Sequence, residues 1–153
     1  MKSIDGKADS VVGATAEECF ALLAAIQHYP EWSGELVRDV HVLEWDASGQ
    51  PTSARVTLHV AQSPLVKDFV LVMSVQAKPV ESVLLARVPH DASDREQLEI
   101  GWRLQREGGT RIDVSFHGVT PRVPSFVPLR GVGDEIADTL VRAAVKALDG
   151  AGG

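Results

Sequence analysis

Residues 14–32 read ATAEECFALLAAIQHYPEW, the pattern of a short amphipathic helix followed by two large aromatic residues. Thr15 and, three residues later, Glu18 form the pattern of a capping box, in which each side chain accepts a hydrogen bond from the backbone N–H of the other residue. Apolar residues recur at three- and four-residue spacing, so one face of this helix must be covered by other elements. The first helix is therefore expected to begin at Thr15.

The aromatic residues of this stretch follow a break in the helix. Pro30 cannot continue a helix and biases Tyr29 toward extended geometry, so the chain is expected to turn there. Tyr29 and Trp32 then lie just beyond the helix, and we expect them to form the rim of a cavity. His28 is the histidine expected at the entrance of that cavity, although a position at the end of the helix dipole explains it equally well.

Beyond Trp32 the apolar residues alternate with polar ones, which is typical of strands. The predicted strands, with one before the first helix, are Asp9–Ala14, Leu36–Trp45, Ser53–Gln62, Lys67–Ala77, Ser82–Val88, Gln97–Arg106 and Thr110–Thr120. They are rich in Val, Leu and Thr, and short segments with Gly, Pro, Asp or Ser separate them. Such short connections permit only antiparallel pairing of successive strands.

The alternation also predicts which residues share a face of the sheet. For the last hairpin we expect a three-residue loop with a glycine bulge, which pairs Glu107 with Arg111 and Trp102 with Phe116 and unites two apolar faces. The same face would include Leu58, Phe69, Leu71 and Met73. The other face would carry the polar residues Arg55, Thr57, Arg103, Asp113, Ser115 and His117.

A second long helix is predicted from Asp134 to about Leu148. Its apolar stripe includes Ile136 and Leu140 and several alanines, acidic residues lie early, and Gly150 follows as a C-cap. The apolar sheet is expected to curl around this helix. Two interpretations of the alanines remain open: they leave volume for a ligand, or they allow close contact between helix and sheet.

Composition excludes several classes of function. The 153 residues fit one domain, expected over 1–149 with a flexible tail at 150–153. A net charge of −6 without a cluster of Lys and Arg argues against nucleic acid and anionic membrane surfaces as partners. No apolar run approaches the length of a membrane span, so we expect no integral membrane association and a cytoplasmic location.

Metals and cofactors are not expected either. The single cysteine, Cys19, lies on the apolar stripe of the first helix and is interpreted as a small buried hydrophobic residue. The histidines show no metal-ligand spacing, and the chain has no phosphate-binding glycine loop or dinucleotide fingerprint.

Together these features resemble the START-like helix-grip superfamily (SRPBCC), closest to its polyketide cyclase/dehydrase or coenzyme-Q-binding-like group. The segments that carry the resemblance are Thr15-Ala-Glu-Glu, Tyr29-Pro-Glu-Trp32, Val40-His-Val-Leu-Glu44, Trp102-Arg-Leu and Gly109-Thr-Arg, followed by the long last helix. The resemblance covers nearly the whole chain. It implies an α+β fold in which a curved antiparallel sheet of about seven strands wraps around a long C-terminal helix, with two short helices after the first strand.

The resemblance also implies a function. Members bind lipids, quinones, polyketides or hormones in a deep apolar pocket between sheet and terminal helix, and some catalyse cyclisation or dehydration. One departure from the family pattern is the run of Pro and Gly residues at 121–133, which is expected to shorten the last helix or loosen the mouth of the pocket.

The predicted site residues follow from the inward-facing positions and from the two aromatics. The expected ligand-binding residues are Tyr29, Trp32, Leu58, Phe69, Leu71, Met73, Trp102, Phe116, Ile136 and Leu140, with His28, Gln62 and Thr120 as polar pocket residues. Catalytic residues are not identified. His59 and His117 fall on the outward face, and Glu96 is interpreted as part of a solvated turn.

Three functions are therefore considered. The first is binding of a small hydrophobic ligand that is lipid-, quinone- or polyketide-like, by a monomer or homodimer. The second is a cyclase or dehydratase that uses the same pocket, which a buried pair of Gln62 and Thr120 would favour. The third is a protein-interaction module without a small ligand, which a large exposed patch at 121–128 together with a collapsed pocket would favour.

Overall fold

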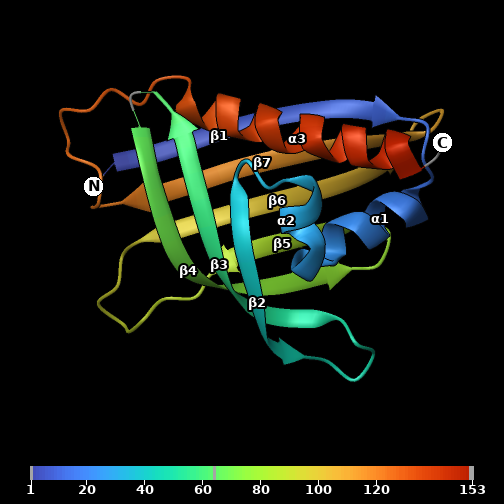
Figure 1. Cartoon of the computed structure of the whole chain (residues 1–153), viewed down its shortest axis with the longest axis horizontal. Coiled ribbons are helices and arrows are strands. Elements are labelled where there is room, and N and C mark those ends of the chain that lie inside the picture. The colour runs from blue at the N-terminus through green and yellow to red at the C-terminus, as the bar shows by residue number, and fades with distance from the viewer. Residues whose placement is uncertain (1, 64, 152–153) are drawn as a thin grey trace.

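A computed structural model describes residues 2–63 and 65–151 of the chain, and its elements lie in the predicted order (Figure 1). The elements are β1 (Lys2–Val12), α1 (Ala16–Ala24), the short 3₁₀ helix η1 (Ile26–His28), α2 (Tyr29–Trp32), β2 (Val37–Trp45), β3 (Pro51–Gln62), β4 (Leu65–Lys78), β5 (Ser82–Arg87), β6 (Gln97–Arg106), β7 (Thr110–Thr120) and α3 (Val132–Ala151). The bounds of β6 and β7 are those predicted.

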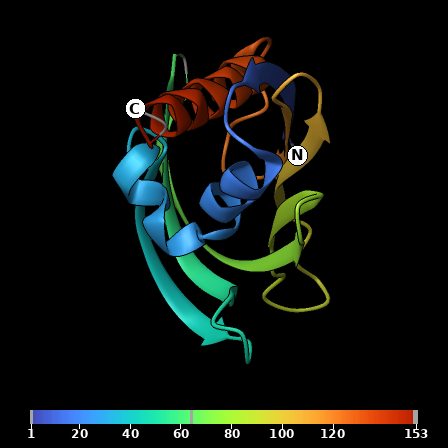
Figure 2. The same cartoon turned by 90° about the vertical axis from the view of Figure 1, so that its right-hand side faces the viewer.

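One seven-stranded sheet runs in the order β1-β7-β6-β5-β4-β3-β2, and all neighbouring strands are antiparallel. The sheet curves, and α3 lies across its concave side along β1 and β7 (Figure 1). Figure 2 shows α1 and α2 at one end, between α3 and the far strands. The predicted α+β helix-grip fold is confirmed.

Apolar and polar residues lie on opposite faces of the sheet, as the alternation predicted. Leu58, Phe69, Leu71, Met73 and Phe116 are buried on the concave face, whereas the six predicted outward residues are exposed or half-buried. His59 and His117 lie on the convex face, where they contact Asp68 and Asp5. No helix of the described residues has the length and apolar character needed to span a membrane.

The predicted register of the β6–β7 hairpin is wrong by two residues. Trp102 lies opposite Val114, and Arg106 pairs with Thr110, so the three-residue loop is Glu107-Gly108-Gly109. A shift of two residues keeps every side chain on its face, so alternation cannot distinguish the two pairings. A second constraint acts on Gly109, which has a φ of 137° and lies so close to the end of β1 that a Cβ would meet the Val12 carbonyl oxygen at 2.3 Å.

The first helix begins as predicted. The Thr15 hydroxyl accepts a hydrogen bond from the Glu18 backbone N–H at 3.1 Å, and Glu18 Oε1 accepts one from the Thr15 N–H at 3.2 Å. Cys19 is fully buried on the inner face of this helix. The capping box therefore sets where the chain leaves β1 and enters α1.

Four elements are longer than predicted. β3 begins at Pro51 instead of Ser53, and β4 runs from Leu65 to Lys78 instead of from Lys67 to Ala77. β1 begins at Lys2 instead of Asp9, and α3 starts at Val132 and continues through Gly150 to Ala151, so Gly150 is not a C-cap. Gly6 and Gly133 allow β1 and α3 to touch, because a Cβ at Gly6 would lie 2.0 Å from the Gly133 carbonyl carbon. The last two residues of the expected tail lie outside the described residues.

Candidate functional site

A small apolar cavity lies between the concave face of the sheet and the start of α3. Its volume is about 20 Å³. The lining residues are Ile4, Val60, Leu65, Phe69, Leu71, Leu98, Phe116, Gly118 and Ile136, with Glu96, Gln97 and Thr120 at one end. A cavity this small holds about one water molecule, whereas one of roughly 150 Å³ binds benzene.

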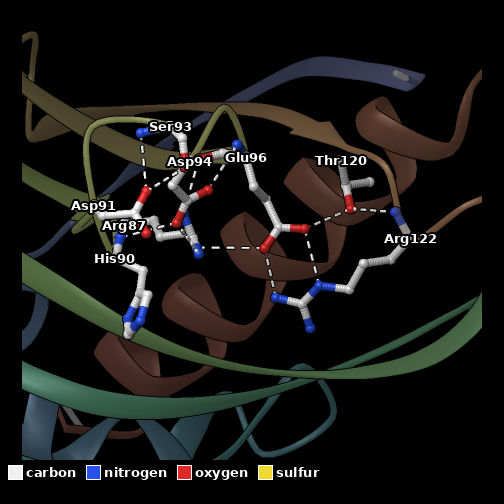
Figure 3. Close-up of polar contacts among 8 residues, drawn as sticks. All are labelled: Arg87, His90, Asp91, Ser93, Asp94, Glu96, Thr120 and Arg122. Atoms are coloured by element: carbon white, nitrogen blue, oxygen red, sulfur yellow. Dashed lines mark hydrogen bonds and ion pairs between the residues drawn. The ribbon is translucent and has the colours of Figure 1, made fainter.

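The polar end of this cavity is an ionic cluster centred on the buried carboxylate of Glu96 (Figure 3). Glu96 immediately precedes β6 and is only 9% exposed. Its Oε2 accepts hydrogen bonds from the Thr120 hydroxyl at 2.7 Å and from Arg122 Nε at 2.9 Å. Its Oε1 contacts Arg122 Nη2 and, at 3.3 Å, Arg87 Nε. The guanidinium carbon of Arg122 also lies 5.1 Å from the centre of the Phe69 ring, within the range of a cation–π contact.

The loop between β5 and β6 fixes the second cation of the cluster. Arg87, the last residue of β5, donates to the Glu96 carbonyl at 2.9 Å and pairs with Asp94 at 2.7 Å. Asp94 also accepts hydrogen bonds from the backbone N–H groups of His90 and Glu96. Figure 3 shows these side chains converging from the loop and from the end of β7. The loop and the chain after β7 are thereby joined at one corner of the sheet.

The hydrogen bonds of the cluster keep both carboxyl groups ionised. Burial alone would raise the pKa of Glu96, but the hydrogen bonds from Arg122 and Thr120 outweigh burial and hold this pKa below its ordinary value. The hydrogen bond from Arg87, together with the His90 N–H, holds the pKa of Asp94 well below its ordinary range. At neutral pH the cluster is therefore a set of charged pairs.

This arrangement limits the chemistry of Glu96. A carboxylate offers about four lone-pair sites, and here two guanidinium groups and a hydroxyl already occupy them. A group with a lowered pKa and no free acceptor site is a poor general base, and because it is ionised it cannot act as a general acid. The cluster can instead hold the chain in place at the end of the cavity, which Glu96 and Thr120 line.

A larger, open groove runs outside the cavity beside α3. One part has a volume of about 480 Å³ and lies between the segment 35–38, the end of β3 and α3. A second part of about 300 Å³ continues along α3 to Trp32 and Lys146. Both parts are lined by Glu35, Leu36, Thr139 and Arg142, so they form one groove, called here the side groove.

The structure distributes the predicted site residues over three places. Phe69, Leu71, Phe116, Ile136 and Thr120 line the cavity. Trp32, Leu140 and Gln62 line the side groove, as Ile136 also does. Tyr29, Leu58, Met73 and Trp102 are buried in the core, and His28 is exposed and contacts Glu31.

The aromatic residues after α1 stack against one another instead of forming an open rim. Tyr29 is 1% exposed and donates its hydroxyl hydrogen to the Leu23 carbonyl at 2.6 Å. Its ring lies 4.7 Å from that of Trp32, which lies 6.3 Å from that of Trp102. Tyr29 therefore helps to close this end of the core.

Two expectations about polar residues need correction. Glu96 is buried and paired, so its interpretation as part of a solvated turn is wrong. Thr120 donates to Glu96 instead of forming the pair with Gln62 that was considered. Arg87 and Arg122 were missed because Glu96, their partner, lies 9 and 26 residues away from them in the chain. The β6–β7 register pairs Gln97 with Val119, so it brings Glu96 beside Thr120, two residues before Arg122.

The alanines of α3 pack closely against the sheet. Ala137 and Ala144 are fully buried, and the residue of α3 that lines the cavity is Ile136. Of the two interpretations, the contacts support close approach. Within residues 2–63 and 65–151, no three His, Cys, Asp or Glu side chains gather in a way that could hold a metal ion.

Comparison with known proteins places the chain among proteins of the same fold. A family model described as polyketide cyclase/dehydrase and lipid transport matches residues 12–145. A START superfamily protein from Mycobacterium smegmatis has a TM-score of 0.72 at 16% identity, with 97% of each chain covered. Among curated protein sequences, none matches this chain.

Two further solved structures have the same fold. The Zhui aromatase/cyclase from a Streptomyces species has a TM-score of 0.68 at 14% identity, covering 97% of this chain and 94% of the other. A major latex-like protein from Panax ginseng has a TM-score of 0.67 at 9% identity, covering 95% of this chain and 97% of the other. At these sequence identities, the similarity shows a shared fold and not a shared function.

Proposed function

The chain belongs to the polyketide cyclase/dehydrase and lipid transport family, as its resemblance to START-like proteins predicted, and from this premise we propose that it binds a small, largely apolar ligand in the cavity between sheet and α3. Membership of this family supports a hydrophobic ligand-binding or cyclase role. The observation that carries the proposal is the cavity itself, whose lining is mainly apolar and has one fixed polar cluster at its end.

The chemistry of the walls suits a ligand that is mainly hydrocarbon. Each Å² of apolar surface removed from water contributes roughly 25 cal/mol, so affinity comes from burial of the ligand's carbon skeleton. At the polar end, Thr120 and Arg122 already donate their hydrogen bonds to Glu96, so this end is a fixed boundary of the apolar space.

The cavity must expand before it holds such a ligand. At about 20 Å³ it is filled mainly by its own side chains, among them Phe69 and Phe116. Binding therefore requires some of these side chains, or the start of α3, to move outward, and the free energy of that movement lowers the affinity.

A cyclase or dehydratase reaction is the second candidate function. An aromatase/cyclase has the same fold, but the likeness is in fold only. The polar cluster favours binding over catalysis, since the acceptor sites of Glu96 are occupied and its pKa is lowered. For the protein-interaction module, Phe126 in the segment 121–128 is 84% exposed and the cavity is small, but a docking surface needs a contiguous apolar patch and not one exposed side chain.

Gly118 allows a test in which the cavity is filled and the fold is kept. It lies on the inner face of β7 and lines the cavity, and a Cβ added there would meet Phe116 Cε1 at 3.6 Å, an ordinary contact distance. We expect wild-type protein to bind N-phenylnaphthylamine with a rise in fluorescence, and Gly118→Val to weaken the affinity by about tenfold or more because its methyl groups occupy the ligand's space.

The matched control is Gly13→Ala, where a Cβ meets nothing within 4 Å. It should leave the dissociation constant unchanged, and thermal unfolding should show that both variants fold. Equal affinities of Gly118→Val and wild type for the probe would show that the probe binds outside the cavity. Failure of the wild type to bind apolar probes would overturn the proposal.

We also infer that the protein acts in the cytoplasm as a monomer or homodimer without nucleic acid. The acidic net charge of −6 supports the part of this inference that concerns nucleic acid. Size-exclusion chromatography with light scattering tests the oligomeric state.

A further inference from the structure

The cavity and the side groove are separated by two side chains. Val60 on β3 and Ile136 on α3 line both of them, and they are 3% and 1% exposed. Each of these side chains therefore has the groove on one side and the cavity on the other.

The opposite end of the cavity is held more firmly. There Arg122 and Thr120 are joined to Glu96 by charged hydrogen bonds, and Arg87 ties the same carboxylate to the β5–β6 loop. An opening at that end would expose or separate buried charges, which costs more than the rotation of two aliphatic side chains. The wall formed by Val60 and Ile136 is the weaker boundary.

We infer that the side groove is the passage by which ligands reach the cavity, and that it holds the polar end of an uncharged amphipathic ligand. This inference rests on the proposed function. The apolar end of the ligand passes between Val60 and Ile136, and the polar end stays in the groove.

The side chains of the groove indicate the chemistry of that polar end. Three carboxylates and three cations line the groove, so their charges balance: Glu35, Glu135 and Asp138 against Arg38, Arg142 and Lys146. A balanced set of donors and acceptors suits hydroxyl or carbonyl groups better than a net anion or cation.

Some of these groups have no partner of their own. Within the described residues, the side chains of Glu35 and Arg38 form no hydrogen bond or ion pair, whereas Arg142 pairs with Asp138 at 2.8 Å. The exposed side chains of Glu35 and Arg38 are free to hydrogen-bond a ligand hydroxyl or carbonyl in the groove.

A bulky adduct in the groove tests the passage directly. Thr139 lies in the middle of the groove, and the one native thiol, Cys19, is fully buried, so a maleimide would label Thr139→Cys selectively. The matched control is Ser125→Cys, exposed in the segment after β7 at the opposite end of the cavity. Stopped-flow fluorescence with N-phenylnaphthylamine gives the association and dissociation rate constants.

The expected result is a matched change in two rates. Blocking the passage should slow association and dissociation of this mostly apolar probe about tenfold each and leave the dissociation constant nearly unchanged, because Kd is the ratio of the two rates. The adduct at Ser125→Cys should change neither rate. If Thr139→Cys does not fold, Arg38→Cys on the facing wall carries the same adduct.

The outcomes separate the two proposals. Unchanged rates with the groove adduct, or slowed rates with the adduct at position 125 alone, would overturn the passage while the unchanged Kd still supports a binding site. Absence of probe binding to the wild type would overturn the proposed function itself. A sulfonated analogue of the probe that binds more tightly than the neutral one would overturn the inference of an uncharged ligand.

Discussion

Glu96 shows how one buried carboxylate can organise a corner of the sheet. It joins the start of β6 to the end of β7 through Thr120 and Arg122, and to β5 through Arg87. The sequence around it is rich in charged residues, which is typical of a solvated turn. Burial depends here on partners up to 26 residues away in the chain, and local sequence cannot show them.

Replacement of Glu96 tests this role through the pH dependence of stability. Its pKa is lower in the folded chain than its ordinary value, so its contribution to stability is present at neutral pH and is lost as the pH falls through the folded-state pKa. We expect Glu96→Gln to lower the free energy of unfolding by about 1–3 kcal/mol at neutral pH. The loss of stability on acidification should then be less steep in Glu96→Gln than in the wild type. Protonation of Asp94 accounts for part of the loss that remains. Urea unfolding at several pH values measures both effects.

Glu99→Gln is the matched control, because Glu99 is exposed on the outer face of the same strand. Its effect on the free energy of unfolding should stay within about 0.5 kcal/mol. If the free energy of unfolding of Glu96→Gln falls on acidification as steeply as that of the wild type, the cluster does not stabilise the fold.

At the scale of elements, the contact between β1 and α3 is decided by two glycines. A Cβ at Gly133 would lie 2.2 Å from the Asp5 carbonyl oxygen, and Asp134 accepts a hydrogen bond from the Lys7 N–H at 3.0 Å. The first turn of α3 therefore rests on the backbone of β1. This contact fixes where Ile136 enters the wall of the cavity.

The substitution Gly6→Ala tests that contact. The added methyl group would collide with the backbone of α3, so we expect the free energy of unfolding to fall by about 2–3 kcal/mol. Thermal or urea unfolding measures this loss. Gly13→Ala, which adds a methyl group in open space, should change stability by less than about 1 kcal/mol. Similar values for the two variants would contradict the close approach.

Sequence patterns predicted the elements well where one face alone is buried. The ranges of β6 and β7 and the capping box of α1 follow from alternation and from local hydrogen bonding. The first half of β1 was missed because its buried residues are Ile4 and Gly6, which alternate with polar residues and give a weak apolar pattern. This half belongs to an edge strand, and α3 covers it. The hairpin register was missed because a two-residue shift preserves the pattern.

The candidate site was predicted in part for a related reason. Inward-facing residues such as Phe69, Phe116 and Ile136 do line the cavity, because their face follows from alternation. Which inward residues border a void depends on the curvature of the sheet and on the tilt of α3. Tyr29 and Met73 share the apolar face or its end and yet lie in packed core.

At the scale of the whole molecule, the helix-grip fold encloses an apolar interior that is nearly filled. The cavity is bounded by an ionic cluster at one end and by two aliphatic side chains at the other. A ligand-binding protein of this kind would be closed when empty and would open at its weaker wall. The central claim is that apolar ligands occupy this interior and not an exposed apolar patch on the outer face.

Methyl NMR spectra of protein labelled at Ile, Leu and Val test that claim most directly, with N-phenylnaphthylamine added stepwise. The cavity methyl groups belong to Ile4, Val60, Leu65, Leu71, Leu98 and Ile136, and the exposed controls to Val66, Val70, Val72 and Val88. The account predicts saturable shifts in the cavity set with little change in the controls. Shifts confined to the exposed valines, or none at all, would contradict it.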